Sequence, residues 1–192
     1  MKNVLIINAH PTKGSFNEAL ANAYKKGAIE AGANVNEITI GELNFDPNLT
    51  HGYTERKEWE PDLITAWAKI EACDHMVWVH PVWWGGLPAI SKGFIDRLFL
   101  PGKAFKFKEN SVFWDKLLKG KTGRIIYTAD QPSWYYRWVN KRPTEYMLKK
   151  MTLEFCGIKP VKTTMVGPIR NSSNQKRKQY LDKAYLLGKN LK

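Results

Sequence analysis

The residues best suited to chemistry lie in one aromatic stretch near the middle of the chain. It runs from His80 to Pro88 and reads His-Pro-Val-Trp-Trp-Gly-Gly-Leu-Pro. Adjacent Trp83 and Trp84 offer broad apolar surface beside a planar ring, and Gly85 lets the backbone approach a ligand closely. The stretch therefore predicts the wall of a binding pocket. One tryptophan is expected to face the site and the other to pack in the core or an interface, and the sequence leaves open which.

Two other polar loops carry candidate ligand-binding groups. The loop at residues 8–17 precedes a helical pattern, so its backbone N–H groups and the helix dipole favour an anion such as a phosphate. The competing interpretation is a capping box, with Ser15 as N-cap and Glu18 as its partner. The loop at residues 128–136 begins with hydrogen-bonding side chains and ends in aromatic ones. It is expected to meet the edge of a heterocycle and to cover the pocket.

Other kinds of site are disfavoured. The triplet Gly120-Lys121-Thr122 looks like the end of a nucleotide-binding P-loop, but position 115 is Asp115 instead of glycine, and a strand follows the triplet. The four histidines show no metal-ligand spacing, and no nucleophile, histidine and acid form a set. We therefore predict neither a nucleoside triphosphatase nor a metal site.

The order of apolar runs and helical patterns predicts how these loops are positioned. We expect strands at 4–7, 35–40, 74–80, 123–128 and 161–166, and helices at 16–30, 61–72, 88–98, 143–155 and 173–191. This alternation indicates an α/β protein with right-handed crossovers and a parallel sheet covered by helices on both faces. Ligands bind such sheets at the carboxyl ends of the strands, where the three loops above converge. Long irregular loops are expected at 41–60, 100–121 and 129–142.

Composition adds wider limits. A chain of 192 residues predicts one domain, spanning 1–192. Cys73 and Cys156 lie far apart in the sequence, which indicates a reducing compartment and a cytoplasmic location. No apolar run reaches transmembrane length. The net charge of +12 is interpreted first as background and second as attraction for an anionic cofactor or partner. Nucleic acid ranks last, because no recognised binding motif is present.

Taken together, the motifs resemble one family over nearly the whole chain, the flavodoxin-like NAD(P)H:quinone oxidoreductases. The first motif joins Asn8-Ala9-His10-Pro11 to Ser15-Phe16-Asn17. The second is His80-Pro81-Val82-Trp83-Trp84-Gly85-Gly86-Leu87-Pro88-Ala89-Ile90, followed by Lys92-Gly93-Phe94-Ile95-Asp96-Arg97-Leu98-Phe99. The two motifs together make a specific signal, whereas either alone is of moderate specificity.

The resemblance implies a three-layer α/β/α sandwich whose five parallel strands lie in the order 2-1-3-4-5. It also implies a homodimer with a flavin, FMN or alternatively FAD, at the carboxyl edge of the sheet. NAD(P)H would reduce the flavin, which would reduce a quinone or similar acceptor in a ping-pong cycle. The implied flavin contacts are His10, Ser15, Phe16 and Asn17 on the phosphate side; Pro81, Val82, Trp83, Trp84 and Gly85 along the ring; and Thr128, Ala129, Asp130 and Gln131 at the far edge.

For the second substrate, the resemblance implies pocket walls formed by Trp84 and Tyr135. Tyr135 also stands near the sequence position at which mammalian members carry a tyrosine proposed to assist hydride transfer, which makes it the candidate catalytic residue. The sequence departs from the family in two places. Ala129-Asp130 replaces a glycine pair, and no histidine follows His80, which excludes a mechanism that needs one there. The alternatives are a flavodoxin-type electron carrier, which is usually acidic, and a flavoprotein subunit that regulates a potassium-efflux transporter.

Overall fold

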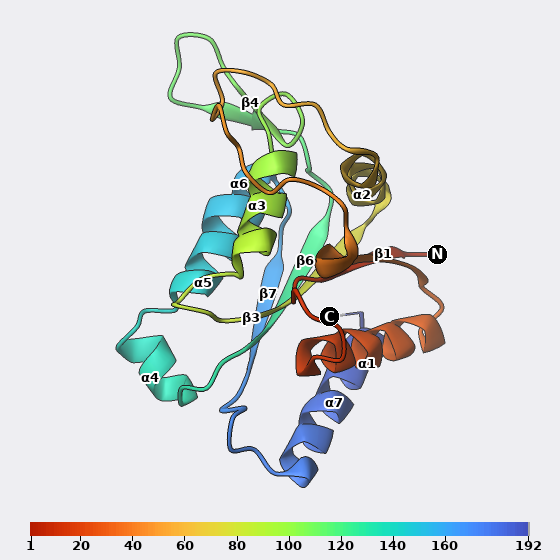
Figure 1. The fold of residues 1–192 in the computed structure, drawn as a ribbon. Helices are drawn as coiled ribbons and strands as arrows, with labels where there is room; N and C mark the ends of the chain where they lie inside the picture. Colours follow the sequence, from red (N-terminus) through yellow and green to blue (C-terminus); the bar gives the residue numbers. More distant parts are fainter. Residues whose placement is uncertain (192) are drawn as a thin grey trace.

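The computed structural model describes residues 1–191, and its centre is a five-stranded parallel sheet (Figure 1). Across the sheet the strands are β2 (Asn34–Thr39), β1 (Asn3–Asn8), β3 (His75–Pro81), β6 (Thr122–Thr128) and β7 (Val161–Val166). The predicted order 2-1-3-4-5 is confirmed when only the strands of this sheet are counted. The order reverses between β1 and β3, which places the expected ligand-binding crevice at the carboxyl ends of these two strands.

The three inner strands are buried because both of their faces are covered, and the middle of β1 is a continuous apolar run. In β1, Val4, Leu5, Ile6 and Ile7 are all at most 1% exposed. The edge strand β2 instead alternates between exposed and more buried positions. Continuous apolar runs are typical of parallel strands buried on both sides, and alternation is typical of a strand with a solvated face.

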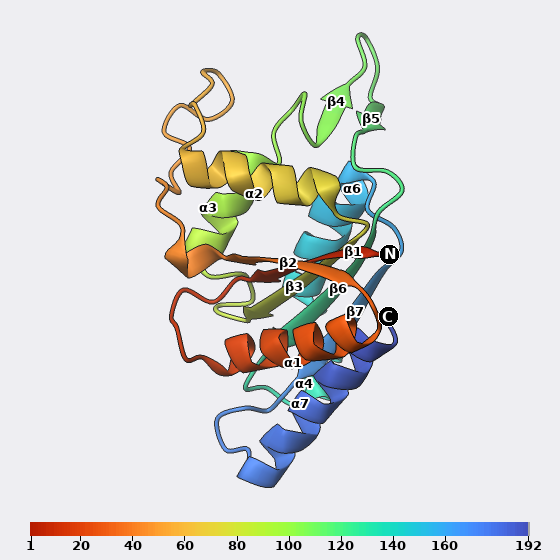
Figure 2. The same cartoon turned by 90° about the vertical axis from the view of Figure 1, so that its right-hand side faces the viewer.

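Helices form a layer on each face of the sheet, as the two views show (Figures 1 and 2). One layer consists of α1 (Phe16–Glu30) and α7 (Asn174–Lys189). The opposite layer consists of α2 (Pro61–Ala72), α3 (Ala89–Leu98) and the consecutive turns α5 (Pro143–Glu145), η2 (Tyr146–Leu153) and α6 (Glu154–Cys156). Successive strand residues face opposite layers, so Val4 and Ile6 join the core under α1 and α7, while Leu5 and Ile7 join the other core.

Helices α1 and α7 pack unusually closely through two glycines. A Cβ atom on Gly27 would lie 2.1 Å from the backbone oxygen of Tyr185, and one on Gly188 would lie 2.0 Å from that of Tyr24. No side chain fits at either position without moving a helix. Each helix begins at a serine N-cap, Ser15 in α1 and Ser173 in α7, which satisfies one otherwise free N–H in its first turn.

The prediction that residues 100–121 form an irregular loop is wrong in part. This segment contains an antiparallel hairpin, β4 (Phe105–Phe107) with β5 (Trp114–Lys116), which projects beyond the helical layer (Figure 2). Strands of three residues are too short for a period of two to be recognised. The ring of Phe155 stacks on Trp114 at 4.2 Å and holds the hairpin to the end of α6.

Three other predicted segments also differ in detail. The loop at 129–142 contains a short helix, α4 (Ser133–Trp138), and the stretch after Thr39 begins with one 3-10 turn, η1 (Ile40–Glu42). The helix predicted at 143–155 is present but is a π-helix over Tyr146–Leu153. Such widened turns are frequent at functional sites, and periodicity alone does not distinguish them from an ordinary helix.

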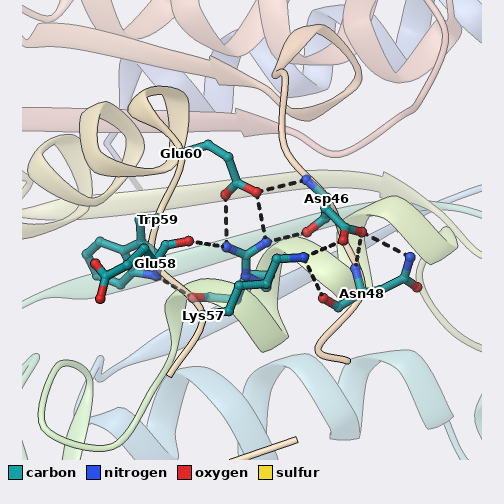
Figure 3. A network of polar contacts seen from close by, with 7 residues as sticks. Asp46, Asn48, Lys57, Glu58, Trp59 and Glu60 are labelled. Carbon is teal, nitrogen blue, oxygen red and sulfur yellow. Dashed lines mark hydrogen bonds and ion pairs between the residues drawn. The ribbon is translucent and has the colours of Figure 1, made fainter. Parts of the chain in front are cut away.

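The long segment between η1 and α2 is fixed to α3 by a buried arginine, Arg97, which is 0% exposed. Its guanidinium forms an ion pair with Glu60 at 2.9 Å and donates hydrogen bonds to the backbone oxygens of Asp46 and Glu58. Figure 3 shows these partners converging, together with Lys57, which binds the Asp46 carboxylate. Arg97 therefore anchors this segment to α3. The helical pattern of the sequence alone does not reveal this role.

Within residues 1–191, no helix is both long and apolar enough to cross a membrane.

Candidate functional site

The three loops singled out from the sequence meet at the carboxyl edge of the sheet. Short backbone hydrogen bonds continue the ladder past the strand ends: Ala9 donates to Val79 at 2.8 Å, Val82 to Thr128 at 2.8 Å, and Ala129 to Val166 at 3.1 Å. These bonds hold the loops after β1, β3 and β6 side by side. The predicted convergence is therefore observed.

The loop after β3 is built around a tight turn at Trp83–Gly86. The two end residues exchange backbone hydrogen bonds of 3.0 and 2.9 Å, and both central residues have positive φ, 49° at Trp84 and 77° at Gly85. Gly85 adopts this backbone freely, but for a tryptophan it costs about 1 kcal/mol. Trp84 therefore occupies a strained position, and its indole is fully exposed. Strain of this kind is often retained at functional sites.

A cavity of about 220 Å³ opens between this turn and the loop after β6. Its lining residues come from both loops and from α4: Val82, Trp84, Gly85, Ala129, Asp130, Gln131, Tyr136 and Asn140. Six of them are residues predicted for the site, Tyr136 was predicted only as part of the covering loop at 128–136, and Asn140 was missed. Trp84 lines this cavity, while Trp83 packs edge-on against the ring of His10 at 5.7 Å. The two indoles are thus divided between the cavity and the loop after β1.

The loop after β1 combines a helix cap with free backbone donors. Ser15 Oγ accepts the N–H of Glu18 at 3.2 Å, as the capping box predicts. The Glu18 carboxylate, however, accepts the N–H of Gly14 at 2.7 Å instead of that of Ser15. Among the described residues, the N–H groups of Phe16 and Asn17 have no acceptor. The start of α1 therefore keeps N–H donors that suit an anion beside its serine cap, and anion binding there stays a prediction.

Asn17 and Thr128 join the first and third loops in the interior. The Asn17 amide donates to Thr128 Oγ1 at 3.1 Å, and both side chains are buried. His10 forms a local turn instead, in which its Nδ1 atom accepts the N–H of Thr12 at 3.0 Å. Asn17 and Thr128 therefore position the two loops relative to each other, and any ligand contact by their side chains stays a prediction.

The loop after β6 is ordered by two polar contacts. Asp130 accepts the backbone N–H of Arg170 at 2.8 Å, and the Gln131 side chain accepts from the Asn140 amide at 2.7 Å. Tyr135, predicted as catalytic, lies on α4 with 38% of its surface exposed and is not among the cavity residues. Its neighbour Tyr136 is buried and lines the cavity. Sequence alone could not separate the two, because the helical turn of α4 was not predicted.

Below the cavity lies a buried polar cluster. Burial raises the pKa of Tyr136 to about 12 and lowers that of His80 to about 3, so both are neutral near pH 7. His80 Nε2 lies 3.4 Å from the Thr144 hydroxyl, and the Thr144 N–H donates to the Tyr136 hydroxyl at 3.2 Å. His80 thus supports the floor of the site and is unsuited to carrying a proton at neutral pH.

A larger cavity of about 560 Å³ lies elsewhere, beside the edge strand β2 and between α1 and α2. Its acidic side chains are occupied: Glu37 pairs with Lys25, Glu42 with Lys13 at 3.0 Å, and Asp62 accepts the N–H of Asn44 at 2.7 Å. Within residues 1–191, no three histidine, cysteine, aspartate or glutamate side chains are grouped as metal ligands. The chemistry therefore points to the smaller cavity at the strand ends.

Comparison with known proteins agrees with this geometry. A family model described as flavodoxin-like fold matches residues 2–186, so the chain belongs to this family. A Haemophilus influenzae protein named "uncharacterized NAD(P)H oxidoreductase" is 30% identical over 186 residues, covering 95% of this chain and 92% of that protein. The resemblance inferred from the sequence motifs is confirmed.

Two further matches broaden the comparison. Mouse ribosyldihydronicotinamide dehydrogenase [quinone] is 27% identical over 210 residues, covering 94% of this chain and 87% of that protein. The crystal structure of an FMN-dependent NADH-azoreductase from Bacillus anthracis, in complex with FMN, superposes with a TM-score of 0.76. The superposition covers 100% of this chain and 99% of the azoreductase chain. At 18% sequence identity, it shows a shared fold only.

The site has features that fit a flavin. Among the described residues, the N–H groups of Trp84 and Gly85 have no acceptor in the protein, as is also true of Phe16 and Asn17 at the start of α1. One pair lies beside the cavity and the other at a helix N-terminus. A planar heterocycle that carries a phosphate could use both sets of donors, whereas a purely apolar ligand could use neither.

Proposed function

We propose that this protein is a flavin-dependent NAD(P)H oxidoreductase that passes a hydride from NAD(P)H through the flavin to a quinone or a similar acceptor. When bound, the flavin supplies the redox chemistry by accepting a hydride and returning it to the second substrate. The observation that carries the proposal is the cavity at the strand ends, with Trp84 on its wall and free N–H donors beside it.

The chain would hold the cofactor through two regions. The start of α1, including the backbone of Ser15, Phe16 and Asn17, is proposed to bind a phosphate through its free N–H groups and the helix dipole. The Trp83–Gly86 turn is proposed to contact the ring, since fixed N–H donors stabilise negative charge that develops beside them. We propose FMN as the cofactor, because one phosphate needs only the donors at α1, and FAD is the alternative.

Substrate binding would use the exposed aromatic side chains around the cavity. Trp84 is proposed to stack on the nicotinamide or quinone ring, and Tyr135 on α4 to contact the substrate from the opposite side. Because both substrates would use the same cavity in turn, initial-rate plots should show the parallel lines of ping-pong kinetics.

We also propose that the protein acts as a homodimer. Trp134 and Trp138 are 61% and 70% exposed, and large exposed apolar side chains commonly mark interaction surfaces. Sedimentation velocity measures the oligomeric state directly. A purely monomeric protein at micromolar concentration would contradict this part of the proposal.

The main test is a flavin and turnover assay. The purified protein should show the visible absorbance of a flavin, or take up FMN or FAD, and should oxidise NADPH or NADH in the presence of a soluble quinone. A colourless protein that binds neither flavin and oxidises neither nucleotide would overturn the proposal.

Replacing Trp84 by alanine tests the role of the cavity wall. Loss of one aromatic contact should lower quinone turnover about tenfold, while the free energy of unfolding changes by less than about 0.5 kcal/mol because the indole is exposed. Phe113, which is 69% exposed on the distant hairpin, provides the control, and Phe113→Ala should leave turnover unchanged. Loss of folding in Trp84→Ala would instead place that indole in the core.

A further inference from the structure

A second, strongly basic groove begins where the cavity at the strand ends stops. The cavity reaches Asn140, and the next two residues enter a groove of about 310 Å³ on α5 and η2. Its lining residues are Lys141, Arg142, Glu145, Tyr146, Lys149 and Lys150. The groove is therefore adjacent to the proposed active site along the chain, and four of its six lining residues are cationic.

The single carboxylate of this groove does not neutralise it. Glu145 accepts a hydrogen bond from the Tyr127 hydroxyl at 2.9 Å and lies 3.5 Å from Arg142. Lys150 is paired with Glu154 at 2.8 Å. Among the described residues, the side-chain ammonium groups of Lys141 and Lys149 have no hydrogen-bonding or ionic partner. Two lysine charges therefore remain available to an anion, in a concave site whose carboxylate is already engaged.

The backbone at the entrance to the groove is strained. Lys141 and Arg142 are consecutive non-glycine residues with positive φ, 57° and 53°, a conformation that is unfavourable for side chains of this size. It is held by a hydrogen bond from the Arg142 N–H to the backbone oxygen of Tyr136 at 3.1 Å, and the backbone oxygen of Arg142 in turn accepts the Tyr146 N–H at 2.9 Å. Tyr136 lines the cavity, so this strained corner connects the cavity to the groove.

We propose that the groove binds phosphate groups of the nicotinamide nucleotide while the nicotinamide occupies the adjacent cavity. The inference rests on the proposed function, because it names the part of the same site that recognises the nucleotide. Lysine and arginine are the side chains that bind phosphate through charge-assisted hydrogen bonds. The phosphate is either the 2′-phosphate found only in NADPH or the pyrophosphate common to NADPH and NADH.

The test is the double variant Lys141→Gln/Lys149→Gln, which removes the two unpaired charges without breaking a hydrogen bond or ion pair of either side chain among the described residues. The matched control is Lys178→Gln/Lys183→Gln, which removes two exposed charges from α7 on the opposite face of the sheet. KM for NADPH and NADH is measured with a quinone acceptor at low ionic strength. In parallel, calorimetric titration with adenosine 2′,5′-bisphosphate measures phosphate binding without any turnover.

The proposal predicts that KM for NADPH rises about tenfold in the groove variant and is unchanged in the control. An effect on NADPH alone identifies the 2′-phosphate, and an equal effect on NADH identifies the pyrophosphate. Wild-type KM should also rise with salt, because exposed charges are screened. Unchanged KM values and unchanged binding of the bisphosphate in the groove variant would overturn the inference while leaving the proposed oxidoreductase intact.

The titration also separates failure of the inference from failure of the proposed function. If the wild-type protein oxidises neither nucleotide, the proposed function fails. Binding of the bisphosphate that is lost in the groove variant would then still support a phosphate site, and equal binding by wild type and variant, or no binding by either, would reject it.

Discussion

At the scale of single residues, the structure separates side chains that hold the fold from those available to a ligand. Arg97 is wholly buried, and its guanidinium forms an ion pair with Glu60 and hydrogen bonds with backbone oxygens of the segment before α2. Lys141 and Lys149 have no such partner among the described residues. Trp84 is exposed on a strained backbone, whereas Trp78 is fully buried. Residue type alone therefore does not indicate a role, and the partners of each side chain do.

Replacing Glu60 by glutamine tests the structural role of Arg97. Burial would raise the pKa of Glu60, but hydrogen bonds from Arg97 and from backbone N–H groups outweigh it and keep this pKa below its usual value. Loss of the carboxylate leaves a buried guanidinium without its counter-ion, so the free energy of unfolding should fall by about 3 kcal/mol. Urea denaturation followed by circular dichroism measures the change.

The control for this prediction is Lys92→Gln on α3, the helix that carries Arg97. Lys92 pairs with Asp96 at 2.6 Å, but both side chains are partly exposed, and such pairs contribute less than about 1 kcal/mol. Equal losses in the two variants would contradict a special role for the buried pair.

At the scale of elements, the loops at the carboxyl ends differ in what fixes them. The loop after β1 is fixed by the helix cap at Ser15, and the loop after β6 by contacts of Asp130 and Gln131. The loop after β3 depends on the Trp83–Gly86 turn, which packs against Pro143 at the start of α5. A change in this turn should therefore be felt both in the cavity and at the neighbouring groove.

A pair of glycine variants tests the geometry of this turn. An alanine at position 85 would have to adopt the left-handed backbone conformation of Gly85, with φ of 77°. Its Cβ atom would lie 3.3 Å from Pro143 Cγ. Gly85→Ala should therefore lower the free energy of unfolding by about 1–2 kcal/mol and weaken flavin affinity in a fluorescence titration. At Gly86 the nearest heavy atom to an added Cβ is 3.8 Å away, so Gly86→Ala should be close to neutral. Identical behaviour of the two variants would show that the turn does not set the site.

At the scale of the whole molecule, two histidines buried in the sheet make stability depend on pH. Burial lowers the pKa of His75 to about 4 and that of His80 to about 3. His75 lies between the Tyr24 hydroxyl at 3.2 Å and Thr122 Oγ1 at 2.7 Å. The folded protein thus keeps both rings neutral at a pH where the unfolded chain, with a pKa of about 6.5, already binds protons.

The sign of the pH effect follows from this difference. Stability is complete above pH ~6.5 and is lost as the pH falls toward 4, by up to about 1.4 kcal/mol per pH unit for each histidine. Urea unfolding at several pH values between 7 and 4.5 should show this slope, and His75→Gln should reduce it by about one proton. His51→Gln, on an exposed loop, is the control and should leave the slope unchanged. A wild-type stability that is flat over this range would contradict the prediction.

Much of the fold follows from local patterns in the sequence. The five apolar runs, the helical spacing and the N-cap at Ser15 each depend on residues close together in the chain, so the sheet strands, the main helices and their order were predictable. The loops that form the site were also predictable, because the carboxyl ends of parallel strands lie on one edge. Missed elements were short, such as β4 and β5, or irregular, such as the π-helix η2, because a few residues do not establish a period.

The sequence by itself determined the family, the parallel sheet and the three loops that build the site, since motifs and periodicity are local. The tertiary structure alone decided which side chains face one another. It placed Trp84 on the cavity and Trp83 against His10, put Tyr136 instead of Tyr135 on the lining, and left Lys141 and Lys149 without partners beside it. These outcomes depend on turn geometry and on contacts between residues distant in the chain, which no local pattern specifies.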